Sequence, residues 1–156
     1  MHPSPLQGRL ALLTATVVSL FLLLVVGAYV TAADFGEACG SVVPSDWPLC
    51  LGNLLPPPIL APVAEYSHRL LAALSTLLLF VTTFIFWKQK QHPADRILIG
   101  ASLLLVAEVV LGGAVVAQGL YAVLVALHQA IGILIFGLAV SALPLARRTP
   151  REQPSA

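Results

Sequence analysis

The chain has 156 residues, of which 58% are hydrophobic and 10% charged, and its formal net charge is +1. A soluble domain averages about 45–50% apolar and about 25% charged residues, and a small domain buries only a modest fraction of its surface, so this composition excludes an ordinary soluble globule. The near-neutral charge excludes the basic face of a nucleic-acid-binding protein. Two cysteines exclude a disulfide-rich scaffold and a four-cysteine zinc site.

Four apolar runs are each long enough to cross a membrane, which takes about 20 residues. They cover residues 10–30, 63–87, 97–117 and 121–145. A cleavable signal peptide is the rival interpretation of the first run, but that run exceeds the apolar region of about 7–15 residues that signal peptides have. The sequence therefore predicts an all-α integral membrane protein, with residues 1–156 forming one four-span domain.

Basic residues indicate how the spans are oriented. Seven of the eight basic residues precede the first run, join the second to the third, or follow the fourth: Arg9, Lys88, Lys90, Arg96, Arg147, Arg148 and Arg151. The connection at 31–62 contains acidic residues and no lysine or arginine. Because basic loops stay in the cytoplasm, we expect a multi-pass protein of the cell membrane with cytoplasmic N and C termini and an extracytoplasmic 31–62 loop. Short connections between neighbouring spans favour an antiparallel four-helix bundle.

Polar and ionisable side chains inside a membrane are costly, so each one is a candidate functional residue. The candidates in this chain are Glu65, His68, Arg69, Glu108 and His128.

His68 and His128 form the most informative pair. They lie five and seven residues inside the second and fourth predicted spans, which places them about 7.5 Å and about 10.5 Å from the same end of the bundle at the helical rise of 1.5 Å per residue. Two imidazoles at similar depth on two helices that run the same way suit the axial ligation of one haem iron. Separate hydrogen-bonded histidines and a quinone-site histidine remain open alternatives.

Glu65 and Arg69 share a helix face with His68, because the three residues follow the i, i+3, i+4 spacing. Glu65 could act as a base or proton carrier one turn from a haem ligand, and Arg69 could bind a haem propionate. An interfacial Glu65–Arg69 ion pair, with Arg69 reaching outward, accounts for the spacing equally well. Glu108 stands in the middle of the third span, where a hydrogen bond to another helix is favoured slightly over a proton path.

Cys39 and Cys50 both lie in the loop that we expect on the oxidising side of the membrane. Their spacing differs from the C-x-x-C redox motif. The sequence favours a disulfide that staples the loop over a thiol pair that exchanges electrons.

Several motifs resemble the haem A synthase family. They are GEAC at 36–39, DWPLCLG at 46–52, the Glu-x-x-His-Arg run at 65–69, LGGAVV at 111–116 and VALH at 125–128. The resemblance covers nearly the whole chain. Members of that family usually have eight spans in two similar halves, and this chain resembles the N-terminal half, with cysteines further apart than is usual.

The resemblance implies an enzyme that oxidises a methyl group of haem O to the formyl group of haem A for cytochrome oxidase assembly. It implies that His68 and His128 ligate haem iron, whether of a haem b cofactor or of the haem O substrate, and that Glu65 is catalytic. It maps the family's cysteine pair to Cys39 and Cys50. Implied partners are a haem O synthase, an electron acceptor, membrane lipid and, because the chain resembles one half, a second copy in a homodimer.

Two other functions remain open from the sequence. One is a non-enzymatic cytochrome b or haem-handling protein with two histidine ligands. The other is a four-helix thiol–quinone oxidoreductase, although that class normally needs a C-x-x-C pair and a second cysteine pair.

Overall fold

The computed structural model describes residues 4–41, 46, 49–89 and 93–147. They form four helices, α1 (Pro5–Ala32), α2 (Leu60–Trp87), α3 (Asp95–Ala117) and α4 (Ala122–Ala146), and the described part of the chain contains no strand longer than one isolated bridge. Each helix is long and apolar enough to cross a membrane. The predicted all-α membrane bundle is therefore confirmed.

Three helices begin earlier than the apolar runs suggest, and the difference is largest for α1 and α2. α1 begins at Pro5 because Ser4 caps it: the Ser4 hydroxyl accepts from the Gln7 N–H, and the Gln7 side chain accepts from the Ser4 N–H. α2 begins at Leu60 rather than near residue 63. Pro62 lies in the first turn of α2, where the missing proline N–H would have no helical partner.

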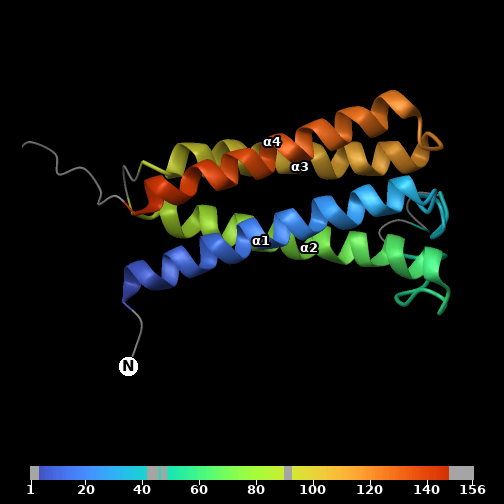
Figure 1. Cartoon of the computed structure of the whole chain (residues 1–156), viewed down its shortest axis with the longest axis horizontal. Coiled ribbons are helices and arrows are strands. Elements are labelled where there is room, and N and C mark those ends of the chain that lie inside the picture. Colours follow the sequence, from blue (N-terminus) through green and yellow to red (C-terminus); the bar gives the residue numbers. More distant parts are fainter. Residues whose placement is uncertain (1–3, 42–45, 47–48, 90–92, 148–156) are drawn as a thin grey trace, which may run out of the picture.

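The helices run alternately up and down, as Figure 1 shows. The closest contacts are within the hairpins α1/α2 and α3/α4, and α1 also packs on α4 and α2 on α3. Among the described residues, α2 and α4 are thus diagonal in the bundle. The described residues of the loop between α1 and α2 and the short α3–α4 turn lie at one end, which we call the loop end, and the start of α1 and the end of α4 lie at the other.

The apolar core occupies the half of the bundle away from the loop end. Its members come from α1 as far as Leu20, from the residue before α3 and the first half of α3, and from the second halves of α2 and α4: Leu13, Leu20, Leu79, Phe86, Ala94, Leu98, Ala101, Leu105, Ile135, Ala139, Ala142 and Ala146. In the described helices, the buried apolar side chains of the other half are Val30, Pro62, Ala64 and Val115. The loop-end half is therefore packed around polar groups instead.

Hydroxyl pairs tie the helices together deeper in the bundle. The hydroxyls of Ser19 and Ser75 lie 2.8 Å apart between α1 and α2, as do those of Thr16 and Thr82. Each buried hydroxyl thus has a partner, which a membrane interior demands.

Some residues used in the sequence analysis lie outside the described residues. These are Lys90, Arg148 and Arg151 of the orientation argument, and Trp47 and Pro48 of the 46–52 motif. The orientation across the membrane stays a prediction.

Candidate functional site

Both intramembrane histidines lie in the loop-end half of the bundle. With the helix starts as observed, His68 is eight residues into α2 and His128 six residues into α4, or about 12 Å and about 9 Å along the helices. The two imidazoles are close enough that a charge on one affects the other. Diagonal helices thus bring two imidazoles to the same region, although the sequence alone did not say that α2 and α4 are diagonal.

Each imidazole packs against a glycine of the preceding helix. A Cβ built on Gly27 of α1 would lie 2.7 Å from His68 Cε1, and one built on Gly112 of α3 would lie 3.1 Å from His128 Cε1. Any larger residue at Gly27 would have to displace the ring. The sequence patterns did not indicate this role of the two glycines.

The two rings differ in their polar neighbours. Nδ1 of His68 is buried and forms no hydrogen bond of good geometry among the described residues, although the ring lies near the backbone of Leu23. Nδ1 of His128 lies 3.1 Å from Oε1 of Glu108 on α3, although the Nδ1–H direction is poorly aligned with that oxygen, so the contact is an ion-pair distance rather than a formed hydrogen bond. The expected inter-helix partner of Glu108 is therefore His128.

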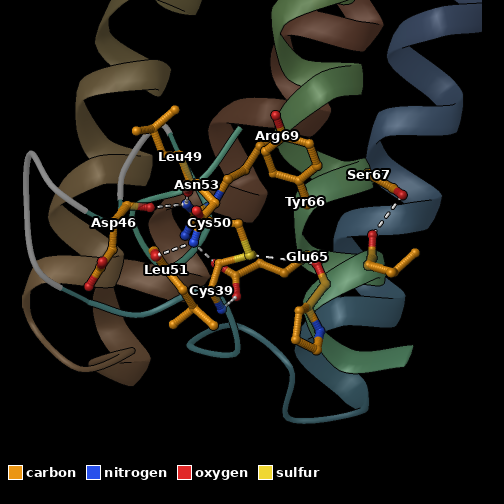
Figure 2. The surroundings of a disulfide bond; sticks show 12 residues. Cys39, Asp46, Leu49, Cys50, Leu51, Asn53, Glu65, Tyr66, Ser67 and Arg69 are labelled. Atoms are coloured by element: carbon orange, nitrogen blue, oxygen red, sulfur yellow. Dashed lines mark hydrogen bonds and ion pairs between the residues drawn. A yellow bond between two sulfur atoms is a disulfide. The ribbon is translucent and has the colours of Figure 1, made fainter. Parts of the chain in front are cut away.

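Glu65 is held by two partners, one in the disulfide loop and one on its own helix α2 (Figure 2). Its carboxylate is buried, with 3% of the residue exposed. Oε2 accepts from the backbone N–H of Cys39 at 2.7 Å, and Oε1 pairs with Arg69 one turn further along α2. A charged carboxylate with both oxygens satisfied can remain buried.

Arg69 ties the loop to α2. One terminal nitrogen donates to the backbone carbonyls of Asp46 and Leu49, and the other donates to Glu65. The side chain is 9% exposed, so the ion pair that the spacing allowed forms beneath the loop, and Arg69 does not reach out to solvent. Because both terminal nitrogens already have partners, binding of a haem propionate by Arg69 stays a prediction.

Cys39 and Cys50 form the predicted disulfide. Both residues are fully buried, and the Leu51 N–H donates to the Cys39 carbonyl at 2.9 Å, which closes the loop around the bond. The same Cys39 supplies the N–H that Glu65 accepts. The staple therefore fixes one end of the Glu65 network (Figure 2).

The donor set fits a haem better than a bare metal ion. No group of three or more histidine, cysteine, aspartate or glutamate side chains that could hold a metal ion occurs within the described ranges. A haem needs only two axial ligands from the protein. The loop-end half offers two imidazoles, neither of which forms a hydrogen bond through its buried Nδ1 to the described residues, in a region with few buried apolar side chains.

Comparison with known proteins identifies the family. The model of the COX15-CtaA family, described as cytochrome oxidase assembly protein, matches residues 60–156. The chain belongs to this family. The match confirms the resemblance that the motifs indicated.

Curated relatives agree with this assignment. A haem A synthase of Alkalihalophilus pseudofirmus is 31% identical over 140 residues, which are 88% of this chain and 46% of that protein. A haem A synthase of Halalkalibacterium halodurans is 29% identical over 146 residues, 92% of this chain and 48% of that protein. The chain thus spans about half the length of these relatives.

A relative with a different name is protoheme IX farnesyltransferase 1 of Natronomonas pharaonis. It is 39% identical over 133 residues, which are 85% of this chain and 27% of that protein. No solved structure matches the chain.

Proposed function

We propose that this family member is a haem A synthase-like membrane oxidoreductase, which oxidises the porphyrin methyl group of haem O to the formyl group of haem A for cytochrome oxidase assembly. The main support for the proposal is the pair of imidazoles on the diagonal helices α2 and α4. Each imidazole packs against a glycine of the neighbouring helix. Haem A synthases among the relatives support the reaction.

His68 and His128 would hold the haem iron as axial ligands. Neutral imidazoles suit this role because they carry no net charge into the membrane. The buried Nδ1 of His68, which forms no hydrogen bond of good geometry among the described residues, and the shortage of buried apolar side chains between the loop-end helices support a site for a large flat group there. A bound haem, as cofactor haem b or as substrate haem O, supplies the iron redox chemistry.

Glu65 would move or hold protons beside the haem. It lies one turn nearer the loop end than His68 on the same helix, and the conversion of a methyl group to a formyl group, with the oxygen atom taken from water, releases protons as well as electrons. The electrons require an external acceptor. Arg69 and the Cys39 N–H position the Glu65 carboxylate.

The acting unit would be a homodimer. The chain spans about half the length of the curated haem A synthases, and its described helices contain one histidine pair. Two identical chains related by a two-fold axis rebuild a two-half architecture most simply. Cross-linking in native membranes tests this, and a catalytically active monomer with one haem would refute it.

Haem O would come from a haem O synthase. The farnesyltransferase of Natronomonas pharaonis contains a stretch similar to this chain. This similarity supports the proposal that the farnesylation of haem is followed by the oxidation of haem O. The basic residues support an extracytoplasmic position for the loop end. The histidines, Glu65 and the disulfide would then lie near the outer leaflet.

Pyridine haemochrome analysis of the full chain, co-expressed with a haem O synthase, tests the enzyme. We expect haem A in membranes with the native chain and haem O alone with Glu65→Gln, which keeps the side-chain shape and removes its charge. Bound haem without any haem A in the native sample would identify a cytochrome instead. A native protein that binds no haem would refute the site itself.

A further inference from the structure

Glu108 is a buried carboxylate that the proposed reaction does not use. It is 8% exposed on α3, and its Oε1 lies 3.1 Å from Nδ1 of His128. Its Oε2 is buried and has no hydrogen-bond partner among the described residues. A carboxylate at this depth is expensive unless it serves a partner, and His128 is the polar group within reach.

The packing around this pair is reciprocal. His128 lies over Gly112, and Oε1 of Glu108 would be 3.2 Å from a Cβ built on Gly132. Glu108 and Gly112 are one turn apart on α3, as are His128 and Gly132 on α4. Each helix therefore supplies one polar side chain and one glycine that makes room for the side chain of the other.

We propose that Glu108 is the positioning residue of His128, an inference that rests on the haem ligation proposed above. By accepting the Nδ1 hydrogen, the carboxylate fixes the tautomer in which Nε2 keeps its lone pair free for the iron, and it makes the imidazole a stronger donor. The ring has to turn about its Cβ–Cγ bond to align Nδ1–H with Oε1.

The two ligands would then be unequal. Glu108 stands four residues before the glycine under His128, and the residue four before the glycine under His68 is Leu23. The Leu23 side chain cannot accept the Nδ1 hydrogen of His68, and the polar group that this ring meets is the uncharged backbone of Leu23. The α3/α4 hairpin therefore provides a carboxylate-supported ligand, and the α1/α2 hairpin provides an ordinary one.

Redox titration of the haem-loaded full chain tests the inference, with haem content measured on the same samples. Glu108→Gln keeps the size of the side chain and an acceptor oxygen but removes the charge, so we expect the haem midpoint potential to rise. Glu108→Leu removes the acceptor as well, and haem affinity should fall about 10- to 100-fold. Ser102→Ala is the control, because it removes another buried polar group of α3, which bonds to Thr83 and lies away from His128.

The outcomes separate this inference from the haem site itself. A raised potential in Glu108→Gln with an unchanged Ser102→Ala supports the positioning role. A haem-loaded Glu108→Gln with the native potential overturns it, as does an equal shift in Ser102→Ala. If His128→Ala keeps the low-spin spectrum of two histidine ligands, then the haem site, and not only the role of Glu108, is wrong.

Discussion

The two hairpins of the bundle place a histidine in the same way but support it differently. In both, the imidazole packs on a glycine of the preceding helix. Near His68 on α2, Glu65 and Arg69 bind the disulfide loop and not the imidazole. Next to His128, a carboxylate on the facing helix lies 3.1 Å from the imidazole itself. One hairpin thus depends on a long loop for its order, and the other depends on direct contact between two helices.

Removing either histidine should have the largest effect, because each hairpin would lose the haem ligand that the two hairpins have in common. His68→Ala and His128→Ala should each abolish the low-spin spectrum of a haem with two histidine ligands, because one remaining imidazole cannot supply both axial positions. Absorption and electron paramagnetic resonance spectra of the purified variants measure this. If both single variants keep the native spectrum, the ligand assignment is wrong.

Removing the disulfide should affect the first hairpin only. The double variant Cys39→Ser with Cys50→Ser should lower the free energy of unfolding by about 3 kcal/mol in the chain-entropy model. Hydrogen exchange should rise around Glu65 at the start of α2 and stay unchanged around His128. An equal rise in both hairpins would show that the loop supports the whole bundle rather than one ligand.

How much the sequence could predict differs between the hairpins for a physical reason. The α3–α4 connection is only residues 118–121, so it sets the register of the two helices. Gly112 lies five residues before the end of α3, and His128 lies six after the start of α4. Their contact could therefore have been inferred from distances along the chain, as could the approach of Glu108 to His128.

The first hairpin offers no such rule, because the connection at 33–59 is too long to fix a register. Charge and hydropathy predicted the four helices, and the loop cysteines predicted their bond. The i, i+4 spacing allowed the Glu65–Arg69 pair. Two contacts depend on how the loop and α1 fold back onto α2, which only the structure shows. They are the hydrogen bond from the Cys39 N–H to Glu65 and the packing of His68 against Gly27.

Alanine substitutions at the two glycines that contact the histidines compare the two hairpins through a smaller expected effect on stability and haem binding. A Cβ at Gly27 lies 2.7 Å from His68 Cε1, closer than the 3.1 Å between a Cβ at Gly112 and His128 Cε1. Gly27→Ala should therefore cost about 1–3 kcal/mol of stability, as overpacking does, and displace haem more than Gly112→Ala. Thermal unfolding and haem content measure both.

Gly113→Ala is the matched control for these variants, because a Cβ there meets nothing within 4 Å. It should be neutral, or stabilise α3 by up to about 1 kcal/mol through the better helix propensity of alanine. A Gly113→Ala protein that loses haem as readily as Gly27→Ala would mean that helix propensity, rather than contact with the imidazole, decides the result.

The smallest expected effect concerns the hydroxyl pair that joins α1 to α2. Ser19 and Ser75 hydrogen-bond at 2.8 Å, and a double-mutant cycle of Ser19→Ala and Ser75→Ala should give a coupling of about 0.6 kcal/mol. The value is small because separated helices in a membrane also find partners for their hydroxyls. The haem spectrum should not change, since this pair lies on the core side of the histidines. A coupling near zero would mean that the disulfide loop and side-chain packing, and not this hydroxyl pair, hold α1 and α2 together.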